Sequence, residues 1–219
     1  MVSTTPPSTS PTIVLKGEQR VVIHGLHWNA YEQILGALPN QRRARLIYDQ
    51  GTLEITMPNE DHDFFGRMIG RFIWILVESL NLTIKTMGST TMNYPAIDRS
   101  AEADEAFYIQ NQPQVSGRNI NFAEDPPPDL VVEVDITHTD IDKNRFYASI
   151  GVPEFWRFNG QSLYIYQLQE GQYVEVEASP TFPTVPKARL YDFLEQCRTN
   201  EVQASKDLRQ WVQQEMQSD

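Results

Sequence analysis

Hydrophobic residues recur at helical spacing in two segments of the first half of the chain. Residues 26–38 carry apolar side chains three or four positions apart, which predicts a helix with Asn29 as a candidate N-cap. Residues 59–82 begin with Asn and acidic residues and are apolar around most of the helical circumference, which predicts a long, largely buried helix. Residues 43–58 contain two strand-like runs separated by Asp-Gln-Gly, a pattern typical of a hairpin.

The second half of the chain contains apolar runs of strand length. They lie at residues 83–87, 103–111, 129–136, 154–159, 162–168 and 172–177. Residues 88–101 and 112–127 are expected to be mainly loop, and residues 140–151 predict a helix that ends at Gly151. One or two further helices follow Leu190, of which residues 200–217 are polar enough to be peripheral. This order of elements predicts an α/β domain with a mixed central sheet flanked by helices.

Composition divides the chain into three parts. Residues 1–18, rich in Ser, Thr and Pro, are expected to be a disordered tail, residues 19–197 one globular domain, and residues 198–219 a C-terminal helix. No apolar run has the length of a membrane span, and the single cysteine, Cys197, is expected to be buried, as suits a protein of the reducing cytoplasm. The net charge of −11 argues against coating with nucleic acid through global electrostatics.

The strand predicted at residues 129–136 carries acidic residues on one side. Leu130, Val132 and Val134 alternate with Asp129, Glu133 and Asp135, because successive side chains of a strand point to opposite faces. An edge strand with one wet face is the simplest interpretation. The acidic side has no cation, however, and the strand leads into a helix that carries Lys143 in its first turn. The ends of strands in α/β sheets are common ligand sites, so a functional cluster is the alternative.

Clustered carboxylates repel one another, and a bound Mg²⁺ or Mn²⁺ removes that repulsion. Such an ion lowers the pKa of a bound water and shields phosphate charge, so the cluster suits hydrolysis of a phosphodiester, with a lysine that stabilises developing charge. A further carboxylate must come from a neighbouring strand. The candidates are Glu54 in the hairpin and Glu102, Asp104 or Glu105 at the start of the strand at 103–111, and alternation does not choose between Asp104 and Glu105.

Several blocks of residues resemble a large bacterial family of restriction-endonuclease-like proteins, formerly a domain of unknown function, in the PD-(D/E)xK nuclease superfamily. The blocks are PDLVVEV at 128–134, Asp-Lys at 142–143 followed by Tyr147, GVPEFW at 151–156, and GTLEITMP at 51–58 followed by His62. The resemblance covers roughly residues 25–195, and its GVPEFW block is the most specific. It implies a restriction-endonuclease-like mixed central sheet flanked by helices.

The resemblance also implies a set of site residues. It selects Asp104 over Glu105 as the first acidic residue, although Ala103 replaces the family's proline, and it makes Asp129 a bystander. Glu133 is the second acidic residue. Asp135 stands where the superfamily places its lysine, and Lys143 of the following helix supplies that lysine instead. Mg²⁺ or Mn²⁺ would then be held by Asp104, Glu133 and Asp135.

Glu54 is a candidate additional ligand of the metal or its water, with a solvent-facing hairpin residue as the alternative. His62 is expected at a helix start in a capping or hydrogen-bonding role more than a catalytic one. The aromatic residues Tyr147, Phe155 and Trp156 are expected in the core. Three nearby arginines, Arg42, Arg43 and Arg45, suit either DNA backbone contact or a solvated strand end.

These residues favour a metal-dependent endonuclease that acts on DNA phosphodiester bonds, with a homodimer possible and no membrane partner. The alternatives are a catalytically lapsed relative that binds nucleic acid or protein, and a structural domain whose carboxylates form a wet strand face. The nuclease hypothesis predicts that Lys143→Ala loses activity with its fold intact. The structural hypothesis predicts that replacing Glu133 with Gln increases stability, because repulsion falls and no metal is lost.

Overall fold

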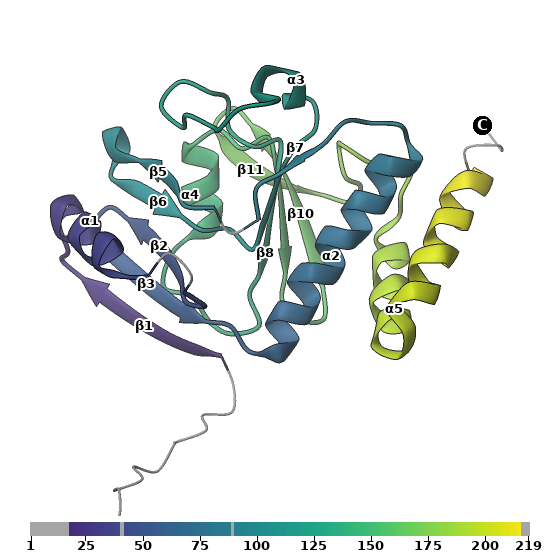
Figure 1. The fold of residues 1–219 in the computed structure, drawn as a ribbon, viewed down its shortest axis with the longest axis horizontal. Coiled ribbons are helices and arrows are strands. Elements are labelled where there is room, and N and C mark those ends of the chain that lie inside the picture. The colour runs from purple at the N-terminus through teal and green to yellow at the C-terminus, as the bar shows by residue number, and fades with distance from the viewer. Residues whose placement is uncertain (1–17, 40–41, 89, 216–219) are drawn as a thin grey trace, which may run out of the picture.

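The computed structural model describes residues 18–39, 42–88 and 90–215, which form two β-sheets flanked by helices (Figure 1). The first sheet has the strand order β1-β3-β2-β6-β5 and the second has the order β11-β10-β9-β8-β7-β4. The strands of the first sheet are β1 (Gln19–His24), β2 (Arg45–Asp49), β3 (Thr52–Met57), β5 (Met92–Tyr94) and β6 (Arg99–Ala101). Those of the second are β4 (Lys85–Thr86), β7 (Glu105–Tyr108), β8 (Leu130–Val134), β9 (Glu154–Phe158), β10 (Leu163–Gln169) and β11 (Gln172–Val176). The predicted mixed α/β fold is therefore confirmed, with two sheets in place of one central sheet.

The predicted hairpin at residues 43–58 is present as β2 and β3. Gln50 and Gly51 connect the strands with φ angles of 45° and 100°, and the left-handed conformation at the second of these positions favours glycine. Strand β1 was not predicted, because its sequence lies beside the polar tail, yet it pairs antiparallel with the whole of β3. Helix α1 (Trp28–Ala37) covers this sheet, and its N-cap is His27, so the predicted cap at Asn29 is wrong.

Strand β8 is an interior strand of the six-stranded sheet. It pairs antiparallel with β7 and parallel with β9, and the crossing between β8 and β9 contains helix α4 (Lys143–Ser149). All five residues of β8 are buried. The interpretation of residues 129–136 as an edge strand with a wet face is therefore wrong, because both faces of the strand are covered.

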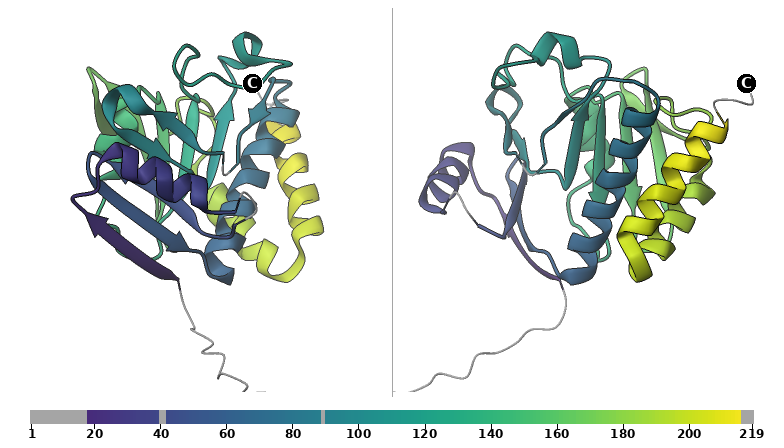
Figure 2. Two further views of the ribbon diagram at one scale, coloured as in Figure 1. Left: turned by 60° about the vertical axis from the view of Figure 1, so that its left-hand side comes forward. Right: turned by 45° about the vertical axis from the view of Figure 1, so that its right-hand side comes forward.

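Helix α2 (Glu60–Ser79) lies across one face of the six-stranded sheet, and helix α5 (Lys187–Glu215) packs on the outer side of α2 (Figure 2). Asn59 caps α2 by accepting a hydrogen bond from the backbone N–H of His62 at 2.9 Å. Helix α5 is broken at Asn200, which has non-helical backbone angles. Its second half buries one apolar face that includes Leu208 and Val212, while its other side is exposed, so the predicted polar outer helix forms the outermost layer.

A second hydrophobic cluster lies on the other face of the six-stranded sheet and joins it to the first sheet. It contains Ile47 of β2, Ala101 of β6, Val131 of β8, Phe146 of α4 and Phe155 of β9. The opposite cluster contains Trp156 and Cys197. The aromatic residues and the cysteine are therefore buried, as predicted, and α4 is held firmly between the two sheets.

Some predicted boundaries differ from the structure. The segment at 88–101, expected to be mainly loop, contains β5, β6 and a short 3₁₀ helix (Pro95–Ile97), and the loop at 112–127 begins with helix α3 (Gln112–Val115). The predicted tail at 1–18 lies outside the described residues except for Glu18, which pairs with Arg20 at 2.7 Å. The last residues of the helix predicted at 200–217 lie outside them as well. No helix among the described residues is long and apolar enough to cross a membrane.

Candidate active site

The candidate site lies where the chain passes from one sheet to the other. Strand β6 ends at Ala101 and β7 begins at Glu105, so residues 102–104 form the connection. Beside them is a cavity of about 20 Å³, which is room for about one water-sized occupant. Its charged and ionisable lining comes from β1, β2, β3, α2, β8, α4 and the connection itself: Arg20, Arg45, Glu54, His62, Glu102, Asp104, Glu133 and Lys143.

Asp104 is buried in this cavity with one carboxylate oxygen engaged and one free of hydrogen bonds. Oδ2 accepts a hydrogen bond from the backbone N–H of Val134 at 2.8 Å and lies 3.4 Å from His62 Nε2. Oδ1 has no hydrogen-bond partner among the described residues, although Arg45 Nε is 3.1 Å away as an ion pair. A buried acceptor without a hydrogen bond is unusual and costly, so this oxygen is available to a ligand.

Glu133 and Lys143 form a buried ion pair at the end of β8. The Lys143 ammonium donates to Glu133 Oε2 at 2.7 Å, and the hydroxyl of Tyr147 donates to Glu133 Oε1. Burial raises the pKa of Glu133 to about 7, against the opposing effect of Lys143. Burial lowers the pKa of Lys143, but the charges of Asp135 and Glu133 outweigh it and raise that pKa above its ordinary value. The lysine is therefore a permanent cation at neutral pH.

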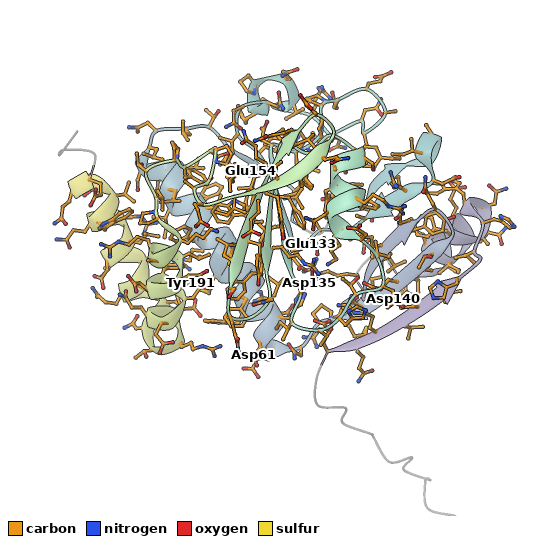
Figure 3. The ribbon with its side chains drawn as sticks, turned by 180° about the vertical axis from the view of Figure 1, so that it is seen from behind. Asp61, Glu133, Asp135, Asp140, Glu154 and Tyr191 are labelled. Atoms are coloured by element: carbon orange, nitrogen blue, oxygen red, sulfur yellow. The ribbon has the colours of Figure 1, made fainter. Side chains whose placement is uncertain are left out.

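Asp135 follows β8 and acts as the second anion around Lys143. Its Oδ1 accepts from Lys143 at 2.6 Å and its Oδ2 from Arg157 Nε at 2.7 Å. Burial acts to raise the pKa of Asp135, but Lys143 and Arg157 outweigh it, so the pKa is lowered overall. Figure 3 shows Glu133 and Asp135 near the middle of the molecule, with Glu154 above them in this view. Both oxygens of Asp135 are engaged by cations, and the residue does not line the cavity.

Glu54 is buried, with 1% of its surface exposed, so the solvent-facing alternative is wrong. Arg20 donates to its carboxylate, and the hydroxyl of Thr139 donates to both oxygens at 3.0 Å. The backbone N–H of Asp140 donates at 3.1 Å. These contacts fix the loop between β8 and α4, and the loop determines where Lys143 enters the site.

Two further carboxylates, those of Glu105 and Asp129, lie outside the cavity lining. Glu105 packs its carboxyl group against Gly70 of α2 and does not line the cavity. Asp129 accepts hydrogen bonds from the backbone N–H groups of Ile109 and Asn111 at 2.7 and 2.9 Å, and from the Asn111 amide at 2.7 Å. Asp129 therefore holds the segment after β7 in place. Of Asp104, Glu105 and Asp129, only Asp104 lines the cavity.

Burial raises the pKa of Glu105 from 4.5 to about 7. Between about pH 4.5 and pH 7, the folded protein therefore keeps a proton on Glu105 that the unfolded chain has released. The contribution of Glu105 to stability is present below about pH 4.5 and is lost as pH rises through about 7. We expect Glu105→Gln to gain up to about 3 kcal/mol relative to wild type between pH 5 and pH 8, measured by urea unfolding. The exposed Glu175→Gln is the control, and an equal pH dependence in wild type and Glu105→Gln would contradict the assignment.

A divalent ion at this cavity would need carboxylate oxygens as ligands. No group of three or more His, Cys, Asp or Glu side chains among the described residues is arranged to hold a metal ion. Mg²⁺ is typically held by one or two carboxylates together with waters and substrate phosphate. Asp104, whose Oδ1 accepts no hydrogen bond, and Glu133 border one cavity, and their carboxylates suit such a site. Asp135 suits it less well, because its oxygens are both taken by cations.

Four residues in these contacts were not predicted as site residues from the sequence: Arg20, Thr139, Tyr147 and Arg157. Tyr147 follows Lys143 by four positions on α4, a spacing that places both on one helix face, so it was detectable in principle. Arg20 was missed together with β1. His62 was expected in a capping or hydrogen-bonding role; Asn59 is the cap, and the imidazole of His62 faces Asp104.

The specific GVPEFW block has a structural role. Glu154 is buried and accepts hydrogen bonds from the indole of Trp156 at 2.6 Å and the hydroxyl of Ser179 at 2.6 Å. Thr181 donates to it through its backbone N–H at 3.0 Å and its hydroxyl at 2.6 Å. This block therefore anchors the segment before α5 at the far end of β9 and does not line the cavity.

The fold and the buried acidic cluster place the protein in the restriction-endonuclease-like class. The family model "Uma2: Putative restriction endonuclease" matches residues 28–196, so the chain belongs to this family. A solved structure is also similar, described as a "putative nuclease belonging to DUF820" from Anabaena variabilis ATCC 29413. The two share 16% sequence identity with a TM-score of 0.54, over 77% of this chain and 99% of the other. No curated protein matches the chain.

Proposed function

We propose that the protein is a metal-dependent endonuclease that hydrolyses DNA phosphodiester bonds in the cytoplasm. The observation that supports this most is that Oδ1 of Asp104, which accepts no hydrogen bond, lies beside the Glu133–Lys143 pair in one cavity. Asp104 and Glu133 would hold Mg²⁺ or Mn²⁺. When bound, the ion would supply a water of lowered pKa and shield the negative charge of the phosphate. Asp135 and Glu54 would act on this site through Lys143 and its loop.

Each protein side chain has a distinct role in this proposal. Lys143 stays protonated, so it orients the attacking water and stabilises developing negative charge, and it does not serve as a general base. Asp135 holds the ammonium in place from the other side, at 2.6 Å. Tyr147 fixes the carboxylate plane of Glu133. A homodimer, which would allow both strands of a duplex to be cut, stays a prediction.

We expect the purified protein to nick or cut supercoiled plasmid in the presence of Mn²⁺ or Mg²⁺ and to stop when EDTA removes the ion. The reason is that a bound ion would both lower the pKa of the attacking water and shield the phosphate charge, and the carboxylates of Asp104 and Glu133 cannot supply that shielding themselves. Agarose gels of plasmid, and labelled single- and double-stranded oligonucleotides, provide the readout. Folded protein that leaves every substrate intact with either ion would contradict the proposal. Cleavage that persists in EDTA would also contradict it.

A further inference from the structure

A second cavity, of about 270 Å³, adjoins the candidate active site. The two cavities share Arg45 and Glu102 in their linings, so they lie next to each other. Four arginines and two carboxylates line the second cavity. They come from β2 and the residues before it, from α2, and from the β6–β7 connection: Arg42, Arg43, Arg45, Arg67, Asp63 and Glu102. Its lining therefore carries a net positive charge, on a chain whose total charge is −11.

The arginines of this cavity have N–H groups that form no hydrogen bond within the described residues. Arg43 and Arg67 are exposed, and neither side chain has a hydrogen-bond or ion-pair partner among the described residues. The Nε atoms of Arg42 and Arg45 are buried without a hydrogen bond. Glu102 neutralises part of Arg42 and also accepts from the Leu46 backbone at 3.0 Å. Buried donors without acceptors are costly, so an anion with several oxygens would stabilise this arrangement.

We propose that this arginine pocket binds a phosphate group of the nucleic-acid substrate, next to the phosphate that is cleaved. The inference rests on the proposed nuclease function, in which the scissile phosphate would lie beside an ion held at the neighbouring cavity. Guanidinium groups form paired hydrogen bonds with phosphate oxygens, and several arginines around one cavity suit this geometry better than lysines would. Arg45 borders both cavities and lies 3.1 Å from Asp104, so it would link the bound phosphate to the reaction centre.

The pocket also explains how an acidic protein can act on a polyanion. Most of its surface charge repels nucleic acid, whereas local positive charge in a concave site attracts phosphate and directs it to one place. The phosphate could come from within a strand or from its end. Both sources present the same chemistry to the arginines, and oligonucleotides with different ends distinguish them.

The test measures binding in EDTA by fluorescence anisotropy, so that cleavage does not interfere. The variants are Arg43→Ala, Arg67→Ala and the double variant, which should fold normally because both side chains are exposed and unpaired. The matched control is Arg71→Ala, an exposed arginine on α2, the helix that carries Arg67, and absent from the cavity lining. We expect each single variant to bind about tenfold more weakly at low salt, with the salt slope reduced by about one, and the double variant to lose about twice that slope, while Arg71→Ala binds like wild type.

Two substrate arms identify the source of the phosphate. Equal binding of 5′-phosphorylated, 5′-hydroxyl and circular single strands would support the pocket with an internal phosphate. A preference for the 5′-phosphorylated strand that disappears in the double variant would support it with a terminal one. The inference would be overturned if all three pocket variants bind with wild-type affinity, if Arg71→Ala loses as much affinity as they do, or if the wild type does not bind.

The outcome is separable from that of the proposed function. If the wild type binds but never cleaves, and the pocket variants lose binding, the arginine pocket stands and the nuclease proposal fails. If the wild type cleaves, and the pocket variants bind and cleave like wild type, the nuclease proposal stands and the pocket fails.

Discussion

We expect Lys143→Ala to abolish the proposed DNA cleavage and to lower the free energy of unfolding by about 3–5 kcal/mol. The ammonium is the shared partner of Glu133 and Asp135, at 2.7 and 2.6 Å, and only 7% of the residue is exposed. Its removal leaves two buried carboxylates without this cation. Sequence reasoning alone expected the fold of this variant to be unaffected, but the burial of the ion pair contradicts that expectation. Cleavage gels and urea unfolding measure the two effects.

A destabilised control separates chemistry from folding. Asp129 is as well buried as Lys143 and accepts three hydrogen bonds, but it lies outside the cavity lining. Asp129→Ala should therefore lose stability by a few kcal/mol and still cleave DNA at a temperature where it is folded. Cleavage by Lys143→Ala at or near the wild-type rate would contradict the role of Lys143. A similar loss of cleavage in the folded Asp129→Ala would show that stability alone limits activity.

We expect Asp104→Asn to lower the rate of the proposed cleavage by about a hundredfold or more while the fold is retained, because the amide can satisfy only one of two demands. Its oxygen must accept from the backbone N–H of Val134, as Oδ2 of Asp104 does at 2.8 Å. The amide nitrogen then takes the position of Oδ1, the oxygen without a hydrogen bond. A metal ligand is thereby replaced by a donor that repels the ion. Cleavage rates over a range of Mn²⁺ concentrations give the readout.

The control for this variant is Glu102→Gln. Glu102 lies two residues before Asp104 and lines the same cavity, but its carboxylate is engaged by Arg42, Leu46 and Thr91. We expect Glu102→Gln to retain its response to Mn²⁺. If Asp104→Asn cleaves like wild type at low Mn²⁺, Asp104 is not a ligand and the first acidic residue has been wrongly assigned.

The sequence predicted the elements whose periodicity is strong. Helix α2, the β2–β3 hairpin and β8 appear within a few residues of the predicted bounds. Strand β1 was missed, and residues 88–101, expected to be mostly loop with at most a short strand, contain both β5 and β6. Short strands beside polar segments have too few alternating positions to be distinguished from loop. The division into two sheets was missed for the same reason, since β1, β5 and β6 build most of the first sheet.

The sequence predicted the acidic residues of the candidate site and Lys143, but not the contacts of Arg20 and Arg157 with those acidic residues. Glu133, Asp135 and Lys143 meet because β8 leads directly into α4, a local relation that the sequence contains. Asp104 came from the resemblance, and the structure places it beside the end of β8. Arg157 reaches Asp135 from the neighbouring parallel strand, and Arg20 reaches Glu54 across β1 and β3. Such contacts depend on strand register, which single-sequence alternation does not determine.

Calorimetric titration of Mn²⁺ into the wild type, Asp104→Asn and Glu133→Gln tests the central claim most directly, because it detects the ion without any substrate. We expect Mn²⁺ to bind to the wild type and this binding to be lost in both variants. The central claim would be contradicted by folded wild-type protein that binds no Mn²⁺, or by binding that persists unchanged when Asp104 is replaced.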